Sequence, residues 1–288
     1  MSFGLALAGG GTRGATHVGV LLALEENGLR PACLSGCSAG GIIAGLYAAG
    51  LNAFKLRNIL VDLAKNGSKL IDADYFGIAA SVIKLVMGKK ITYSGYLKGN
   101  KLEKLMYEYT NGININEVYI PLVIPAVDLC SGKTIAFTSY KLEPKPLPNI
   151  EWQTGVCLAE VMRASAAVPG VFRPKYIGDY CLVDGGVTNI LPVDLLSAFC
   201  NQKIIAIDIS EQYNAPEHGN IFEITTHSYE LMRLRLIDCL YQHHGFLIRP
   251  PLPENAGLLT FEYMVECMNI GYDTVSRIMP AIKEYLAE

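Results

Sequence analysis

The sequence contains no run of about 18 apolar residues, which is the length that a membrane-spanning helix requires. Charged residues make up only 18% of the 288 positions, so a coiled coil and a highly charged disordered chain are excluded. The apolar fraction is 51%, which is enough to bury a large core. The net charge of −3 does not suggest an electrostatic footprint for nucleic acid, and we expect no nucleic-acid partner.

Two further absences concern targeting and redox state. The N-terminal residues carry no basic flank of a secretory signal, and the eight cysteines include no C-x-x-C pair. The cysteines lie mostly in apolar stretches, where they usually act as small buried hydrophobes. We therefore expect a reduced, cytoplasmic protein. Cys239 and His243 lie four residues apart in an expected helix, but two ligands are too few for a metal site.

The first fifty residues alternate between apolar strands and helical segments. The pattern predicts strands at 3–8 and 32–36, and helices at 12–27 and 39–49. This order favours a parallel sheet covered on both faces, which is an α/β fold. No repeat or low-complexity linker interrupts the chain, so we expect a single domain over residues 1–288.

The rest of the chain predicts two hairpins, further buried strands and long helices. The apolar stretch Ile78–Met87 is followed by Lys89 and Lys90. Such a helix is typical of a peripheral contact with a membrane surface, although packing on the protein core is the favoured interpretation. The expected strands are 120–127, 134–139, 176–177, 180–183, 203–209 and 246–248, the helical segments are 52–106, 154–164, 221–241 and 262–286 with a kink or break at Pro280, and the loops are 72–77, 89–99 and 141–149.

The first of three motifs lies between the first expected strand and helix. It is Gly9-Gly10-Gly11-Thr12-Arg13-Gly14, which fits G-x-G-x-x-G. A glycine loop at a helix N-terminus presents free backbone N–H groups, so it can hold a phosphate or a developing oxyanion. A dinucleotide site would require an acidic residue at the end of the second strand, which ends instead at Gly36 and continues into Cys37 and Ser38. Dinucleotide binding is therefore disfavoured.

The second motif is Gly36-Cys37-Ser38-Ala39-Gly40, a G-x-S-x-G between a strand and a helix. This is the context of a nucleophile elbow, where a sharp turn lifts the serine hydroxyl clear of the sheet and requires small neighbours. The helix N-terminus behind Ser38 favours negative charge near the reacting carbon. An N-cap serine in a glycine-rich turn is the alternative, but motif and context together favour a nucleophile.

The third motif is Asp184-Gly185-Gly186, at the end of the second expected hairpin. Asp-Gly is a common turn, but a serine nucleophile needs a base, and this aspartate sits at a strand terminus. From the residues alone two assignments remain open. Asp184 takes the serine proton directly, with its basicity raised by desolvation, or it orients a histidine of a triad, namely His227, His243 or His244.

Taken in order, the three motifs resemble those of the patatin-like phospholipase family, in particular its small bacterial members. The likeness continues through Ala164–Phe172, Asn189–Val193, Ile248–Pro250 and Ile270–Tyr272. The resemblance implies a three-layer α/β/α sandwich with a mainly parallel central sheet. It also implies that the motifs lie within about residues 4–197 and that 198–288 complete the same fold.

For the site, the resemblance implies that Ser38 is the nucleophile and Asp184 the general base, without a catalytic histidine. It assigns the oxyanion donors to the backbone of Gly9–Gly14, chiefly Gly10, Gly11 and Thr12. It implies that His17 packs within its helix. Arg13 either clamps the loop, which is the favoured role, or meets a lipid phosphate. The pocket walls are expected from residues 52–106 and the C-terminal helices.

The expected function is therefore hydrolysis of a lipid or another acyl ester through a covalent acyl-enzyme, with no metal or organic cofactor. Two alternatives remain. The chain could be a lipid-binding or regulatory module with little turnover, because motifs do not measure rate. It could also be an esterase with a Ser-Asp-His triad. The sequence predicts neither the particular ester nor the oligomeric state.

Overall fold

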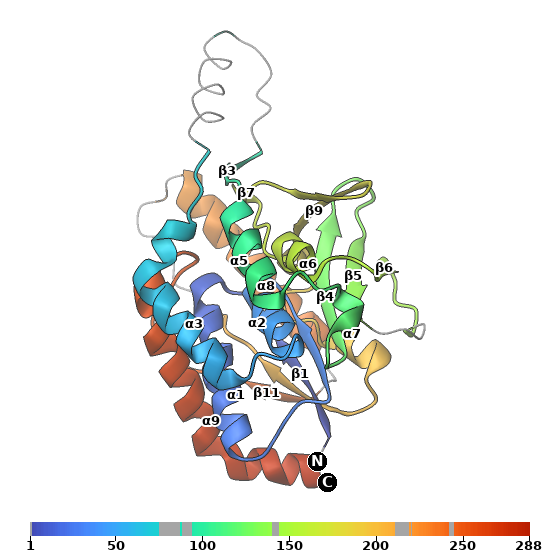
Figure 1. The fold of residues 1–288 in the computed structure, drawn as a ribbon, viewed down its shortest axis with the longest axis vertical. Helices are drawn as coiled ribbons and strands as arrows, with labels where there is room; N and C mark the ends of the chain where they lie inside the picture. The colour runs from blue at the N-terminus through green and yellow to red at the C-terminus, as the bar shows by residue number, and fades with distance from the viewer. Residues whose placement is uncertain are drawn as a thin grey trace.

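The computed structural model describes residues 2–74, 94–139, 144–210, 221–241 and 245–288, together with Met87 and Gly219. A mainly parallel sheet forms the centre of the molecule, and helices flank it (Figure 1). This arrangement confirms the α/β class that the sequence predicts. Residues 78–86 of the apolar stretch, as well as His243 and His244, lie outside the described residues.

The strands form one large sheet and one small one. They are β1 (Phe3–Leu7), β2 (Cys33–Gly36), β3 (Gly95–Leu97), β4 (Leu122–Asp128), β5 (Thr134–Thr138), β6 (Ile150–Gln153), β7 (Gly170–Phe172), β8 (Lys175–Ile177), β9 (Tyr180–Asp184), β10 (Lys203–Ile207) and β11 (Phe246–Ile248). The large sheet has the order β11-β10-β1-β2-β4-β5-β6, and β9 pairs with both β4 and β8. β5 and β9 run antiparallel to β4, whereas β1, β2, β10 and β11 are parallel to their neighbours. Every residue of β1 is buried, as expected for a strand at the centre of such a sheet.

The helices pack on this sheet and on one another. They are α1 (Ala15–Glu26), α2 (Ala39–Ala48), α3 (Ala53–Asn66), α5 (Asn100–Thr110), α6 (Leu158–Ser165), α7 (Val193–Phe199), α8 (Ile221–Tyr241) and α9 (Met264–Ala287). α2 and α6 contact β4, and α7 contacts β1, β2 and β10. α1 and α9 pack closely because Gly19 and Gly271 let the two backbones approach. In the described part of the chain, no helix is long and apolar enough to cross a membrane.

Several expected elements differ from the structure. The segment 89–99, expected as a loop, contains β3, which pairs with β7 far along the chain. The sequence also missed β6, and α6 begins at Leu158 rather than near residue 154. A break at Pro280 was wrong, since α9 continues through it. Pro280 and Ser276, four residues earlier, are both exposed, so water can satisfy the carbonyl that the proline leaves without a donor.

The cysteines correct a second expectation. Cys33 and Cys200 form a disulfide with their Cα atoms 6.6 Å apart, so the prediction of a fully reduced chain was wrong for this pair. Packing of α7 against β2 brings them together across 167 residues of sequence, a contact that spacing alone could not reveal. Cys37 and Cys267 are buried as expected, whereas Cys130 and Cys239 are exposed.

Candidate active site

Ser38 occupies a sharp turn between β2 and α2. Its backbone has φ 51° and ψ −121°, a strained conformation for a residue with a side chain and one that is typical of a nucleophile elbow. A Cβ atom on Gly36 would collide with the carbonyl group of Gly40, and one on Gly40 would collide with the carbonyl group of Leu7. The turn can therefore form only with glycine at both motif positions.

Three hydrogen bonds hold this turn. The N–H of Ser38 donates to Ser165 Oγ at 3.0 Å, and the N–H of Cys37 donates to the Leu7 carbonyl at 3.1 Å. The carbonyl of Ser38 accepts from the N–H of Ile42 at 3.0 Å, which starts α2. Ser165 is fully buried at the end of α6. The sequence placed Ser165 in a segment of small residues but gave no sign of this contact.

The position of Asp184 follows from the pairing of β4. β5 occupies one side of β4 along its length, so β2 and β9 must share the other side. β2 pairs with Leu122 and Val123, while β9 runs in the opposite direction along the stretch from Ala126 to Asp128. The carboxyl ends of β2 and β9 consequently face each other. Ser38 follows the first of these ends and Asp184 forms the second.

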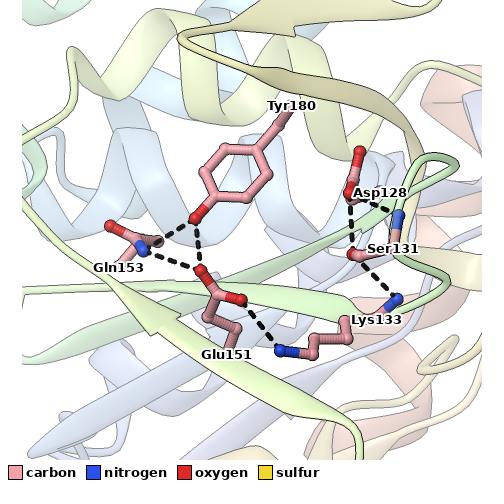
Figure 2. A network of polar contacts seen from close by, with 6 residues as sticks. All are labelled: Asp128, Ser131, Lys133, Glu151, Gln153 and Tyr180. Carbon is pink, nitrogen blue, oxygen red and sulfur yellow. Dashed lines mark hydrogen bonds and ion pairs between the residues drawn. The ribbon is translucent and has the colours of Figure 1, made fainter.

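A polar network holds β9 in this register (Figure 2). The carboxylate of Asp128 accepts the N–H of Cys181 at 2.9 Å and the N–H of Ser131 at 2.8 Å, which joins the β4–β5 turn to β9. One residue earlier, the hydroxyl of Tyr180 donates to Glu151 of β6. Lys133 and Gln153 also contact Glu151, at 3.3 Å and 3.1 Å. The strand that ends in Asp184 is thus tied by side-chain contacts to β4 and to β6.

Ser38 and Asp184 are directly hydrogen-bonded. Ser38 Oγ donates to Asp184 Oδ2 at 2.6 Å, and both side chains are buried. The other carboxylate oxygen, Oδ1, accepts the N–H of Gly186 at 2.6 Å and lies 3.7 Å from the thiol of Cys37. Gly185 lies against the carbonyl of Pro125, where a Cβ atom would not fit. One oxygen of the carboxylate is therefore anchored, and the other faces the serine.

Burial sets the ionisation of this pair. Desolvation raises the pKa of Asp184 above its ordinary value, while the hydrogen bonds from Ser38 and Gly186 and the positive charge of Arg233 oppose the shift. Burial and the charge of Asp184 also raise the pKa of Cys37, so its thiol keeps its proton. The aspartate is consequently a stronger base than an aspartate in water.

The glycine loop contains amides of two kinds. The N–H of Gly9 donates to the Ile190 carbonyl at 2.9 Å, and the N–H of Thr12 donates to the Leu258 carbonyl at 3.2 Å. Gly10 and Gly11 lie between them, and within the described residues their N–H groups have no acceptor. Two of the candidate oxyanion donors are thus used by the fold. Gly14 ends the following 3-10 turn and packs against Ala39.

Three side chains hold the carbonyl groups of the loop. His17 Nε2 lies 2.8 Å from the Ala8 carbonyl; burial lowers the pKa of His17 to about 4, so the ring is neutral and donates this bond. Arg13 Nε donates to the Gly10 carbonyl at 3.3 Å, as a clamp would. Arg233 Nη2, from α8, donates to the Gly9 carbonyl at 3.3 Å. No motif in the sequence indicated Arg233.

An apolar cavity of about 160 Å³ opens beside Ser38. Its walls come from α2, α3, α5 and the segment around Leu258, which agrees with the expected contribution of residues 52–106. Thr12, Ser38 and Tyr109 supply the polar side chains of the lining, and the other lining residues are glycine, alanine or larger apolar residues. Among the described residues, no three His, Cys, Asp or Glu side chains gather to hold a metal ion.

The fold and the site together define a class of α/β proteins in which a serine elbow, an aspartate and a glycine loop meet at one edge of the sheet. The family model of the patatin-like phospholipases matches residues 5–197, and the chain belongs to that family. The resemblance recognised in the motifs is thereby confirmed.

Similar proteins agree with this assignment. An uncharacterized NTE family protein of Mycobacterium tuberculosis is 27% identical over 213 residues, covering 74% of this chain and 50% of that protein. Lysophospholipase NTE1 of Debaryomyces hansenii is 26% identical over 208 residues, covering 72% of this chain and 12% of that protein. The chain thus spans about half the length of its mycobacterial relative. VipD from Legionella pneumophila shares the fold, with a TM-score of 0.52 and 15% identity over 97% of this chain and 67% of that one.

Proposed function

We propose that this chain is a lipid acyl-ester hydrolase in which Ser38 is the nucleophile and Asp184 the general base. The observation that carries the proposal is the 2.6 Å hydrogen bond between Ser38 Oγ and Asp184 Oδ2, buried beside an apolar cavity. The family supports a lipid ester as the substrate, and one relative is named a lysophospholipase.

In the proposed acylation, Ser38 Oγ attacks the ester carbonyl carbon while its proton moves to Asp184 Oδ2. The carbonyl oxygen becomes a tetrahedral oxyanion, which accepts hydrogen bonds from the N–H groups of Gly10 and Gly11. Each such donor is worth roughly 2.7–4 kcal/mol. When the intermediate collapses, the bond to the leaving alcohol breaks and Asp184 returns the proton to the alcohol oxygen. The acyl group remains on Ser38.

In the proposed deacylation, a water molecule attacks the acyl carbon and Asp184 takes one of its protons. The bond to Ser38 Oγ then breaks, Asp184 returns the proton to the serine, and the fatty acid leaves. The same two residues therefore serve both halves of the reaction, and no step requires a cofactor.

Two features support the dyad over a triad. In a triad the histidine stands between serine and aspartate, whereas here the two side chains are directly bonded. The raised pKa of Asp184 also supplies the basicity that a histidine would otherwise provide.

The cavity supports a fatty acyl chain as the bound group. Burying each methylene contributes about 0.8 kcal/mol, so an aliphatic lining binds a long acyl chain more tightly than a short one and binds a polar group weakly. The lining beside Ser38 is aliphatic almost throughout. We therefore propose that the acyl chain lies in this cavity with its carbonyl group at Ser38.

The test is labelling by a fluorophosphonate together with hydrolysis of a p-nitrophenyl acyl ester in the presence of a chelator. We expect the wild-type protein to be labelled and active, and Ser38→Ala to lose both properties. Ser35→Ala is the matched control, because Ser35 is buried on β2 and its hydroxyl has no partner in the described structure.

Three outcomes would change the assignment. Full activity in Ser38→Ala would reject the nucleophile. Loss of activity in His227→Ala, His243→Ala or His244→Ala as large as the loss in Asp184→Asn would replace the dyad by a triad. A wild-type protein that binds lipid but is neither labelled nor active would be a lipid-binding module.

A further inference from the structure

The N–H groups of Gly10 and Gly11, which have no acceptor in the part of the chain that the structure describes, share a feature that the proposed mechanism does not use. Each belongs to a peptide group whose carbonyl oxygen is held by an arginine. Arg233 Nη2 donates to the carbonyl of Gly9, which forms one peptide group with the N–H of Gly10. Arg13 Nε donates to the carbonyl of Gly10, which forms one peptide group with the N–H of Gly11.

Peptide planarity couples these contacts to the direction of the N–H groups. In a trans peptide the C=O and N–H bonds point to opposite sides of the chain, and the described residues contain no cis peptide bond. An arginine that holds the carbonyl on one side therefore fixes the N–H on the other. Glycine backbones rotate more freely than those of any other residue, so this loop needs such a restraint.

We propose that Arg233 is a positioning residue of the oxyanion hole, which holds the Gly9–Gly10 peptide so that the N–H of Gly10 faces the reacting carbonyl oxygen. Arg13 does the same for the next peptide. The inference rests on the proposed function, and it gives α8 a role in catalysis although α8 lies far from the motifs in sequence.

The surroundings of Arg233 fit this role. Its side chain is only 11% exposed, and Glu230 holds Nη1 at 2.6 Å, so the guanidinium is anchored where it meets the loop. Its Nε is buried without a hydrogen-bond partner among the described residues, an arrangement that costs free energy. A charged donor on the carbonyl also polarises the peptide and strengthens its N–H as a donor.

Gly9 lies close enough to the nucleophile for a small rotation to matter. A Cβ atom on Gly9 would stand 3.0 Å from the Cβ of Ser38. A change in the orientation of the Gly9–Gly10 peptide would therefore be felt directly at the reacting carbon. The acyl cavity does not include Arg233 among its lining residues, so loss of the arginine should leave acyl-chain binding unchanged.

The experiment compares the wild-type protein with Arg233→Gln, Arg233→Lys and the control Arg235→Gln, which changes an exposed arginine of the same helix. For each protein we would measure kcat and KM for an acyl ester and the Ki of a trifluoromethyl ketone with the same acyl chain. Ser38 Oγ adds to the ketone carbon, Asp184 takes the serine proton, and the ketone oxygen becomes an oxyanion in the hole. No leaving group departs, so Ki reports the addition of Ser38 and the stabilisation of the oxyanion without the later steps of the reaction.

For Arg233→Gln we expect kcat to fall about 10- to 100-fold with KM unchanged, which is less than the 10²- to 10³-fold loss from deleting a donor. The Ki of the ketone should rise by the same factor. Arg233→Lys should recover part of both losses, because an ammonium group can donate to the Gly9 carbonyl. Arg235→Gln should match the wild-type protein.

A kcat of Arg233→Gln within twofold of the wild-type value would overturn the inference. A fall in kcat with an unchanged Ki would overturn it as well, because the stabilisation of the oxyanion in the ketone adduct would then not depend on Arg233. If Arg233→Gln does not fold, the Lys variant decides by the same two readouts. Hydrolysis that survives Ser38→Ala would instead reject the proposed function itself, and this inference with it.

Discussion

Ser38 stands between two regions that are built on different principles. On its polar side, each contact joins one donor to one acceptor, such as Ser38 Oγ to Asp184 Oδ2 at 2.6 Å and the N–H of Ser38 to Ser165 Oγ at 3.0 Å. On its apolar side, the cavity is lined by many aliphatic side chains that make no directed contacts. The polar side therefore depends on the positions of individual atoms, whereas the apolar side depends on the volume of the cavity.

This difference predicts how the site responds to substitution. A change of one atom on the polar side removes an interaction that no neighbour can replace. A change on the apolar side alters the space for methylene groups, and each group contributes only about 0.8 kcal/mol. Substitutions on the polar side should therefore change the rate for every substrate, and those on the apolar side should change the preference among substrates.

The largest effect is expected for Asp184→Asn. The amide keeps the shape of the carboxylate but cannot take the serine proton, so kcat should fall about 10⁴-fold. Stability should change in the opposite direction. The pKa of Asp184 is raised in the folded state, so the buried carboxylate lowers stability above that pKa, and the penalty disappears below the unfolded-state value of about 3.9. The variant should therefore be more stable than the wild-type protein at neutral pH and lose this gain as the pH falls.

Ester hydrolysis and urea unfolding between pH 4 and pH 8 measure both effects. Asp179→Asn is the control, because Asp179 is exposed in the turn that precedes β9. An Asp184→Asn variant that keeps more than about one hundredth of the activity would contradict the role of general base. If the gain in unfolding free energy did not depend on pH, it would not come from the loss of a buried carboxylate charge.

The sequence predicted the parts of the site that are formed by residues close together in the chain. The glycine loop and the elbow each consist of a strand, a turn and a helix within a few residues, so their motifs specify local structure. Asp184 reaches Ser38 across 146 residues of sequence and was predicted only through its motif. Residues that reach the site by tertiary contact without a motif escaped prediction. Ser165 meets Ser38 because α6 packs on the elbow, and Arg233 meets Gly9 across 224 residues of sequence. Neither contact leaves a pattern in the spacing of the chain.

The disulfide and the small sheet missed by the sequence have the same cause. Cys33 meets Cys200, and β3 meets β7, because the fold brings segments together that are distant in the sequence. The apolar side was predicted in outline, since the region 52–106 supplies much of the cavity wall. Aliphatic helices can be recognised from composition, but directed polar contacts cannot.

The second prediction concerns His17, whose ring contacts the Ala8 carbonyl just before the glycine loop on the polar side of the site. The folded-state pKa of about 4 lies below the ordinary value of 6.5, so its contribution to stability is present above pH 6.5 and is lost as the pH falls towards 4. The difference corresponds to about 3 kcal/mol of unfolding free energy. Urea unfolding between pH 7.5 and pH 4.5 should show this loss in the wild-type protein, and His17→Gln should show a flatter pH dependence.

The comparison of the two proteins isolates His17, because the other titrating groups contribute equally to both. Equal slopes against pH would show that the ring is not neutral and buried in the folded state. A His17→Gln variant that stays folded should also keep most of its activity, because the glutamine amide can donate to the Ala8 carbonyl in place of the ring.

The smallest effect is expected on the apolar side, for Leu105→Trp. Leu105 lines the cavity from α5 and is only partly buried, so an indole can be accommodated and will fill space that an acyl chain would occupy. Displacing about two methylene groups costs about 1.6 kcal/mol, which lowers kcat/KM for a long-chain ester about 10-fold. A short-chain ester does not reach this part of the cavity and should be hydrolysed at the wild-type rate.

Parallel assays with p-nitrophenyl esters of a short and a long acyl chain test this prediction. Leu129→Trp provides the control, because Leu129 is 59% exposed beyond the end of β4 and does not line the cavity. If Leu105→Trp slowed both esters equally, the cavity would not hold the acyl chain. The apolar side would then not set the preference among substrates. A loss confined to the long-chain ester, together with the equal losses expected for Asp184→Asn, would establish that one side of Ser38 sets the rate and the other the substrate preference.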